Sequence, residues 1–371
     1  MAKRIGLLSG SLSRANGGVF EAVVAQADML ADLNAVPVVI GVADEHTAQD
    51  RARFGDIEVL AVQGRGPGRL AYAPKLGQTL EAARLDLLHL HGIWQYPVHV
   101  AGRWAQATGR PLVVSPHGML DPWITGRGRA KKAIARTVWE RRGWRSASLF
   151  HALTEAEAAD IAREVANVPS SVVPNAAPPA GPVRGTLPEP HFVYLGRIHP
   201  KKGIDALIEG WKWANEHLPD AARLTIAGWG EDAHVEALRG QLDAAPRSVR
   251  FAGPVHGEAK DALLRSARAV VLPSHSEGLP MVLLEAWAAG TPTIQTEACH
   301  LPQGPRSGAG WMVEADGASI AGALIEAASQ DEASWLAMSR AARTLACGPF
   351  ARSTVAQRWA QVYDDLMDRA G

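Results

Sequence analysis

The sequence has little of what marks several classes of protein. It contains only two cysteines, Cys299 and Cys347, which excludes a disulfide framework and fits a reducing cytoplasm. No apolar run approaches the roughly 18 residues of a membrane-spanning helix, and the apolar stretch after the initial MAKR is too short for a signal peptide. Lysine plus arginine equals aspartate plus glutamate, at 38 each, so overall charge gives no reason to expect nucleic acid as a partner. We therefore expect a cytoplasmic protein that meets a membrane, if at all, peripherally on its inner face.

What is present predicts two domains of the α/β class. The 371 residues are too many for one ordinary core. Short β-branched runs alternate with helical patterns, stop at a proline- and glycine-rich stretch over 174–190, and then begin again. This alternation predicts doubly wound parallel sheets, and hence two Rossmann-like domains that face each other across a cleft. We expect domains over 1–176 and 190–350, with a C-terminal helix over about 352–371 that packs back on the first.

Two glutamates in the stretch SEGLPMVLLEAWAAGTP raise a question about partners. The pattern predicts a strand before Glu277 and a buried helix from about Pro280 to Ala289, with Glu285 inside an otherwise apolar run. An unpaired buried carboxylate costs several kcal/mol. Glu285 therefore requires a hydrogen-bond donor, which either the protein or a ligand supplies.

Cations and glycines follow other expected strands of the second domain. Gly196, Arg197 and Lys202 come after one strand and just before a helix, which is an arrangement that binds anions; a solvated basic loop is the alternative. Glycine turns follow two more strands, at Gly228 and before Val255. This set suits a nucleoside diphosphate. No D-x-D pair stands at a strand end, and because Arg197 and Lys202 would take its place we expect no required metal or cofactor.

The stretches EGLPMVLLEAWAAGTPT and GRIHPKKG together resemble the retaining glycosyltransferases of the GT-B fold, family 4, also called group 1. The resemblance implies that Arg197 and Lys202 bind the donor diphosphate, that Glu285 accepts hydrogen bonds from the ribose, and that Glu277 lies near the transferred sugar. The implied donor-binding residues are Gly17, Gly18, Gly196, Arg197, Lys202, Gly228, Val255, Glu277, Gly278, Leu279, Pro280 and Glu285. The implied catalytic residues are His117, Glu277, Arg197 and Lys202.

The N-terminal half has weaker motifs. The loop with Gly17 and Gly18 is not G-x-G-x-x-G, which disfavours a dehydrogenase and leaves an ordinary strand-to-helix turn as the alternative. His117 directly follows an expected strand, and in the resembled family a histidine at this point lies near the reacting sugar. His89 and His91 share one face of another strand, with no third metal ligand in evidence. The candidates for the acceptor site are Trp94, Gln95, Asp121 and Trp123.

A basic stretch over 127–145 has eight cationic residues against the single acid Glu140. Its apolar spacing predicts an amphipathic helix, with Trp139 and Trp144 near its end. Such a helix is typical of binding to an anionic membrane surface; a solvated helix is the alternative.

Together with these features, the resemblance implies a retaining glycosyltransferase that moves a hexose from a GDP- or UDP-sugar to a glycan acceptor. The resemblance further favours a polyprenyl-diphosphate-linked acceptor in surface polysaccharide biosynthesis, although Gln303 stands where such enzymes carry an acid. Two alternatives stay open, a GT-B sugar-nucleotide epimerase and a non-catalytic nucleotide-sugar-binding subunit.

Overall fold

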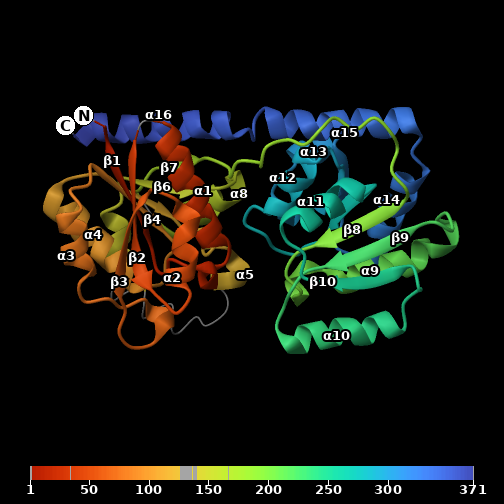
Figure 1. The fold of residues 1–371 in the computed structure, drawn as a ribbon, viewed down its shortest axis with the longest axis horizontal. Helices are drawn as coiled ribbons and strands as arrows, with labels where there is room; N and C mark the ends of the chain where they lie inside the picture. Colours follow the sequence, from red (N-terminus) through yellow and green to blue (C-terminus); the bar gives the residue numbers. More distant parts are fainter. Residues whose placement is uncertain (1, 34, 126–135, 137–139, 166, 371) are drawn as a thin grey trace. The chain divides into compact units, whose positions relative to one another are not determined.

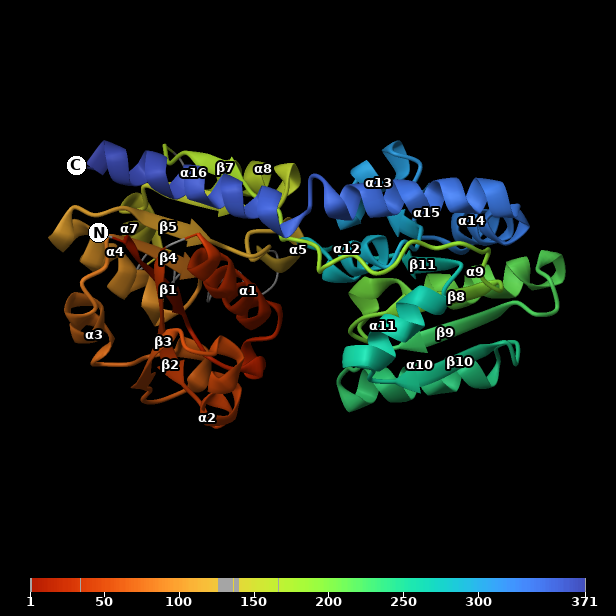
Figure 2. The same cartoon turned by 45° about the horizontal axis from the view of Figure 1, so that its top comes forward.

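The computed structural model describes residues 2–33, 35–125, 136, 140–165 and 167–370. The chain divides into two compact units. Unit 1 runs to Pro174 and includes the chain from Val355 onward, and unit 2 is Asn175–Thr354. Residues 174–190, where a linker is expected, contain no helix or strand. Each unit is a parallel sheet with helices packed on it (Figures 1 and 2).

Unit 1 is built on a seven-stranded parallel sheet of order β3-β2-β1-β4-β5-β6-β7. Its strands are β1 (Arg4–Ser9), β2 (Val36–Ala43), β3 (Glu58–Gln63), β4 (Leu87–His91), β5 (Leu112–Ser115), β6 (Leu149–Ala152) and β7 (Ser170–Val172). Its helices include α1 (Gly18–Asp32), α2 (Thr47–Asp50), α3 (Leu76–Ala82), α4 (Tyr96–Thr108), α5 (Pro122–Thr125), α7 (Arg141–Arg145), α8 (Glu155–Glu164) and most of α16 (Arg352–Ala370). Strands buried on both faces tend to be hydrophobic runs, as β2 (VPVVIGVA) is, whereas the fully buried β4 (LLHLH) also carries His89 and His91.

The C-terminal helix α16 belongs to this first unit. The Tyr363 hydroxyl lies 2.7 Å from His89 Nδ1 of β4 and also contacts Gln26 of α1. Tyr363 is 1% exposed, so the end of the chain completes the core of the unit in which the chain begins.

Unit 2 repeats the architecture with a six-stranded parallel sheet of order β10-β9-β8-β11-β12-β13. Its strands are β8 (His191–Leu195), β9 (Arg223–Ala227), β10 (Val249–Gly253), β11 (Ala269–Leu272), β12 (Thr293–Thr296) and β13 (Gly310–Val313). Its α-helices are α9 (Ile204–Ala214), α10 (Asp232–Asp243), α11 (Gly257–Ser266), α12 (Met281–Ala288), α13 (Gln303–Arg306), α14 (Gly317–Ser329) and α15 (Glu332–Cys347). Both sheets reverse their winding at one point, between β1 and β4 and between β8 and β11. The structure thus confirms the predicted fold class of two doubly wound α/β units.

Candidate functional site

The loops after β8 and β11 meet where the winding of the unit 2 sheet reverses, which is where open α/β sheets bind ligands. The first loop carries Arg197 and Lys202 and the second carries Glu277. The backbone holds the two together, because the His275 N–H donates to the Lys201 carbonyl at 2.8 Å. Lys202 and Glu277, which are 75 positions apart in sequence, are thereby placed in one site.

Lys202 and Glu277 form the central pair of this site. Lys202 Nζ donates to Glu277 Oε1, and the two side chains are only 13% and 7% exposed. The Ser274 hydroxyl donates to the same oxygen at 2.6 Å. Burial, reinforced by the Glu277 charge, raises the pKa of Tyr194 well above its usual value and that of the Cys299 thiol to about 12. Both neighbours stay neutral at pH 7, so the charge here is concentrated on the Lys202–Glu277 pair.

Two glycines allow these loops to come close. Gly203, directly before α9, has φ +64°, and a Cβ atom there would lie 2.1 Å from the Pro273 carbonyl oxygen. Gly228, after β9, has φ +150°, and a Cβ atom would lie 1.7 Å from the Gly196 carbonyl oxygen. A side chain at either position would push apart the strand-end loops that make the site.

Arg197 lies at the rim of the same site. Its guanidinium donates to Glu231 Oε1 at 3.0 Å, with both side chains about half exposed or more, at 48% and 67%. Exposed pairs of this kind contribute roughly 0–1 kcal/mol. Exchanging Glu231 for a ligand anion would therefore cost little.

Glu285 has a partner in the protein, which the sequence left open. Lys260 of α11 donates from Nζ to Glu285 Oε1 at 2.9 Å, and the two side chains are 29% and 20% exposed. Helix α12 buries Leu283 and Trp287 completely, but its Glu285 side is half-buried. The expected buried helix is thus found over Met281–Ala288, and it departs from the expectation on its Glu285 side, which faces α11 rather than the core.

The other donor-binding residues predicted in unit 2 lie in the loops after β10 and β11. Leu279 and Pro280 are buried ahead of α12, and Gly278 is half-buried. Val255, in the loop after β10, packs against the core cluster that includes Leu195 and Ala286.

The structure adds an aromatic residue that sequence reasoning did not single out. Trp229 follows β9 between Gly228 and Gly230 and is 53% exposed. Its ring centroid lies 6.2 Å from that of His256 in the loop after β10. The Trp229 carbonyl accepts the Ile198 N–H at 2.6 Å, so the indole stands on a fixed backbone. The sequence did carry a signal for this residue, since a tryptophan between two glycines directly after a strand is expected to lie exposed in the loop at the strand end.

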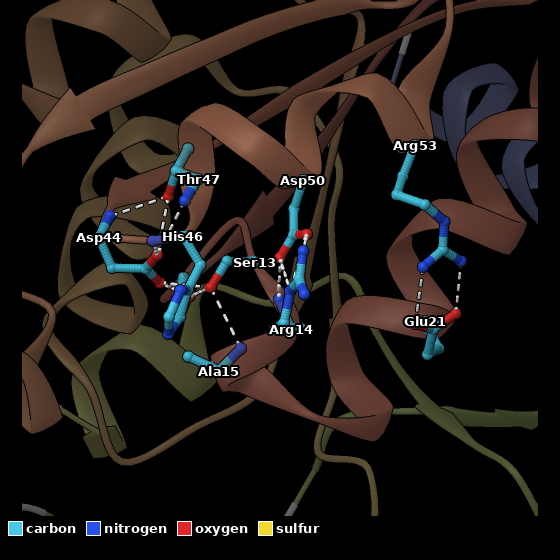
Figure 3. A network of polar contacts seen from close by, with 10 residues as sticks. Ser13, Arg14, Ala15, Glu21, Asp44, His46, Thr47, Asp50 and Arg53 are labelled. Carbon is cyan, nitrogen blue, oxygen red and sulfur yellow. Dashed lines mark hydrogen bonds and ion pairs between the residues drawn. The ribbon is translucent and has the colours of Figure 1, made fainter. Parts of the chain in front are cut away.

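In unit 1, Gly17 and Gly18 lie exposed at the start of α1. Carboxylates from the segment after β2 fix the preceding loop (Figure 3). Asp44 accepts the Ser13 hydroxyl at 2.7 Å, and Asp50 accepts the Arg14 N–H at 2.8 Å as well as its guanidinium. Hydrogen bonds from Arg14 lower the pKa of Asp50 to about 2. These contacts join distant segments, and the sequence pattern alone did not indicate them.

His117 follows β5 with a left-handed backbone, φ +53°, which is uncommon for a residue with a side chain. Its Nε2 lies 3.0 Å from His91 Nδ1, and burial lowers the pKa of His117 to about 3. The next residue, Gly118, donates its N–H to Glu157 Oε1 at 2.6 Å. His117 is thus a neutral imidazole on a constrained loop at pH 7.

The four residues predicted for the acceptor follow β4 and β5, at the same sheet edge as His117. Trp94 packs its indole on Trp144, with centroids 5.6 Å apart. Gln95 lies over Gly10, where a Cβ atom would come within 1.8 Å of its Oε1. Asp121 is half-buried. Trp123 belongs to α5, and its side chain is outside what the structure describes.

Most of the basic stretch over 127–145 lies outside the described residues, Trp139 included. Of its described part, Arg136 pairs with Glu164 at 2.7 Å and lies over the Trp94 ring at 5.5 Å. Trp144 is 3% exposed in the core of unit 1. The expectation that Trp144 marks a membrane-facing surface is wrong, because its indole fills the space between Trp94 and Phe150.

The described residues bear on metal binding and on membrane spanning in two respects. Across that part of the chain, no group of three or more histidine, cysteine, aspartate or glutamate residues is arranged to hold a metal ion. None of the helices described is both long and apolar enough to cross a lipid bilayer.

Comparison with known proteins places the chain in a family. A family model for "Glycosyl transferases group 1" matches residues 189–330, and one for a "Glycosyl transferase 4-like domain" matches residues 17–176. The chain is 30% identical to glycogen synthase of Mycobacterium tuberculosis over 305 residues, and this matched region covers 78% of this chain and 70% of that protein. It is also 30% identical to phosphatidyl-myo-inositol mannosyltransferase of Mycobacterium leprae, over 69% of each chain. A solved structure of Anabaena Alr3699/HepE, in complex with UDP and glucose, matches with a TM-score of 0.75 at 19% identity, over 98% of this chain and 100% of that one. The chain belongs to the group 1 glycosyltransferases, with the GT-B fold.

Proposed function

We propose that the protein is a retaining glycosyltransferase that moves a hexose from a nucleoside diphosphate sugar to a glycan. The observation that carries this is the Lys202–Glu277 pair, 13% and 7% exposed at the switch point of unit 2. A cation held there can bind the diphosphate on one side of the bond that breaks, and a carboxylate can contact the sugar on the other side. The Anabaena structures with UDP and with UDP-glucose favour a UDP-sugar as donor, and a GDP-sugar is the alternative.

The chemistry follows from where charge develops. Breaking the glycosidic bond leaves a diphosphate whose negative charge grows toward the transition state. Lys202, already ordered by Glu277, and Arg197, whose exposed pair with Glu231 exchanges at little cost, would stabilise that charge, and such preorganised groups contribute most where charge develops. These cations supply what a metal ion supplies elsewhere, so turnover should need no added metal. Adding chelator tests this; activity that is lost with chelator and restored by a divalent ion would contradict it.

Retention of configuration would come from attack by the acceptor hydroxyl on the same face of the donor sugar from which the diphosphate leaves. The leaving diphosphate would help to deprotonate the acceptor, as the family resemblance implies. Glu277 Oε1 already binds Lys202 and the Ser274 hydroxyl, which reduces its nucleophilicity and disfavours a stable glycosyl-enzyme. NMR of the product within the first turnovers would show the α-anomer; a β-anomer would refute retention.

We propose a glycan acceptor carried on a polyprenyl diphosphate, in surface polysaccharide biosynthesis on the cytoplasmic side of the membrane. Lipid-linked acceptors stay in the bilayer, so the enzyme must reach it. Helix α7 offers Arg141, Arg142 and Arg145, all exposed, with Trp144 turned into the core. Attraction to anionic lipid would then be electrostatic and reversible, without an inserted aromatic residue.

One experiment separates a transferase from an epimerase and from a non-catalytic binding subunit. UDP release from UDP-glucose would be measured alone, with a maltooligosaccharide, and with a polyprenyl-diphosphate-linked sugar. A transferase releases UDP in step with glycosylated product and only when an acceptor is present. Epimerised UDP-sugar without an acceptor, or binding of UDP-glucose with no release under any condition, would refute the proposal.

A further inference from the structure

Unit 1 holds a cluster of buried histidines outside the donor-binding loops. His89 and His91 of β4, His151 of β6 and His117 after β5 lie within one run of ring contacts, with His89 stacked on His91 at 4.2 Å and His91 on His117 at 5.2 Å. His89, His91 and His151 are 0–4% exposed. Buried imidazoles require hydrogen-bond partners, and the partners present determine where each proton lies.

One carbonyl fixes the proton positions in the first part of the cluster. The Val173 carbonyl can only accept, so His151 Nε2, 2.7 Å away, carries a proton. The neutral His151 then accepts at Nδ1 from the Ser115 hydroxyl at 2.6 Å. Ser115 Oγ in turn accepts the proton of His89 Nε2 at 2.6 Å, and His89 Nδ1 accepts the Tyr363 hydroxyl at 2.7 Å. Each ring nitrogen of His151 and His89 thus already has a hydrogen-bond partner, so none is left to bind His91.

His91 therefore has a single partner among the described residues. Its Nδ1 lies 3.0 Å from His117 Nε2, and its Nε2 is buried with no hydrogen-bond partner in the part of the chain described. If His117 donated this bond, the proton of His91 would be stranded on Nε2. If His91 donates it, only a lone pair is stranded. Among backbone groups, buried N–H donors without a partner are rarer than under-satisfied acceptors, and the same reasoning applied to the imidazole favours His91 as donor.

We propose that His91 is a positioning residue that holds His117 in the tautomer protonated at Nδ1, so that His117 presents an N–H donor to a hydroxyl oxygen of the bound sugar or acceptor. The inference rests on the proposed function, because His117 would lie beside the reacting sugar, as the family resemblance implies, only if the protein is such a glycosyltransferase. His117 is half-buried as a residue whereas His91 is 2% exposed, so His117 is the more exposed member of this pair.

The left-handed backbone of His117 gives a reason for such a support. A strained conformation persists only where the surroundings hold it, and the hydrogen bond and stacking from His91 do so. The chemical consequence is specific. With its lone pair at Nε2 occupied by His91, His117 serves as a hydrogen-bond donor and not as a base that removes the proton of the acceptor.

Two variants of near-equal size test the hydrogen bond itself. The amide nitrogen of asparagine occupies nearly the position of imidazole Nδ1, whereas that of glutamine reaches the position of Nε2. His91→Asn should keep the donor to His117 and retain turnover within a few-fold. His91→Gln should lower kcat roughly 100-fold, as expected when a reacting group is misplaced by about 1 Å, with the Kd for UDP unchanged because UDP would bind in unit 2. Equal losses in both variants, at unchanged melting temperature, would overturn the proposal.

A second measurement does not depend on activity or on a variant that folds. Long-range ¹H–¹⁵N correlation spectra of the wild type labelled in histidine report which ring nitrogen carries the proton. We expect His117 protonated at Nδ1 and His151 at Nε2. A His117 protonated at Nε2 would refute the tautomer assignment even if the protein is an active transferase. Failure to bind UDP or to turn over would refute the proposed function while leaving the tautomer result standing.

Discussion

Replacing Lys202 by methionine tests the central pair of unit 2 most directly. The change leaves the Glu277 carboxylate 7% exposed, with the Ser274 hydroxyl at 2.6 Å as its remaining donor. Removing one partner of a buried ion pair typically costs about 3–5 kcal/mol, a large part of the roughly 5–15 kcal/mol that stabilises a domain. We expect Lys202→Met to lower the free energy of unfolding by that amount, measured by urea unfolding followed by circular dichroism.

A double-mutant cycle shows whether the cost comes from the stranded charge. Glu277→Gln removes the charge while keeping the size and a hydrogen-bonding oxygen. The Lys202→Met/Glu277→Gln variant should therefore be more stable than Lys202→Met alone, with a coupling energy of about 2–3 kcal/mol, the upper part of the range for residues in contact. Effects that add to within about 0.5 kcal/mol would show that the two side chains do not depend on each other, and the reasoning would fail.

The same variants separate stability from turnover. If Lys202 stabilises the leaving diphosphate, the double variant recovers stability but stays about 10²–10³-fold below Glu277→Gln alone in kcat, the loss typical of one preorganised charge-stabilising contact. Turnover that returns together with stability would make Lys202 a structural residue only.

Four further predictions follow from the structure. Glu285→Ala should weaken UDP binding roughly 10- to 150-fold in calorimetry, the value of about 1.5–3 kcal/mol for a hydrogen bond to a charged group; an effect no larger than that of Lys260→Met would assign Glu285 to its ion pair alone. Trp229→Ala should weaken UDP binding about 5- to 150-fold if the indole stacks on the base, whereas Trp213→Ala, also 53% exposed, should not; equal effects would refute stacking. Reversing the three exposed arginines of α7 should release the protein from anionic vesicles, since each cation contributes about 1 kcal/mol; wild-type protein that ignores such vesicles at low salt would contradict this. The free energy of unfolding should fall as pH drops below about 6.5, because burial holds the pKa of the unit 1 histidines below that of histidine in the unfolded chain. The unfolded state then binds more protons than the folded state, at a cost of up to about 1.4 kcal/mol per pH unit for each histidine. Urea unfolding at pH 7.5, 6 and 5 checks this, and a flat profile would refute it.

Sequence periodicity predicted the two sheets because strands buried on both faces leave an unmistakable apolar run. It also placed Arg197, Lys202 and Glu277 at strand ends, and the parallel topology then brought the last two into contact. The partner of Glu285 escaped prediction because Lys260 lies on a neighbouring helix, and the contact depends on how α11 packs on α12. A helical pattern shows which residues share a face, but not what that face meets.

The aromatic and histidine residues of unit 1 show the same limit. Trp144 belongs to a basic stretch whose pattern is typical of a surface helix, yet its indole is buried. His89 and His91 were correctly placed on one face of a strand, as their stacking at 4.2 Å shows. That this face also meets Tyr363 followed only from the packing of a helix that lies 274 residues away in the chain.

The candidate site residues of the two units differ in charge, and this bears on what each would contribute to a transfer reaction. Unit 2 concentrates charge at its switch point, through the buried Lys202–Glu277 pair and the exposed Arg197. Unit 1 keeps its histidine cluster neutral, since burial lowers the pKa of His117 to about 3 and of His151 to about 4. In the role proposed for it, a neutral His117 would bind a sugar hydroxyl without adding a charge of its own. Nucleotide binding should therefore weaken with salt, because it depends on unit 2 charges, whereas loss of the fold in mild acid should begin in unit 1.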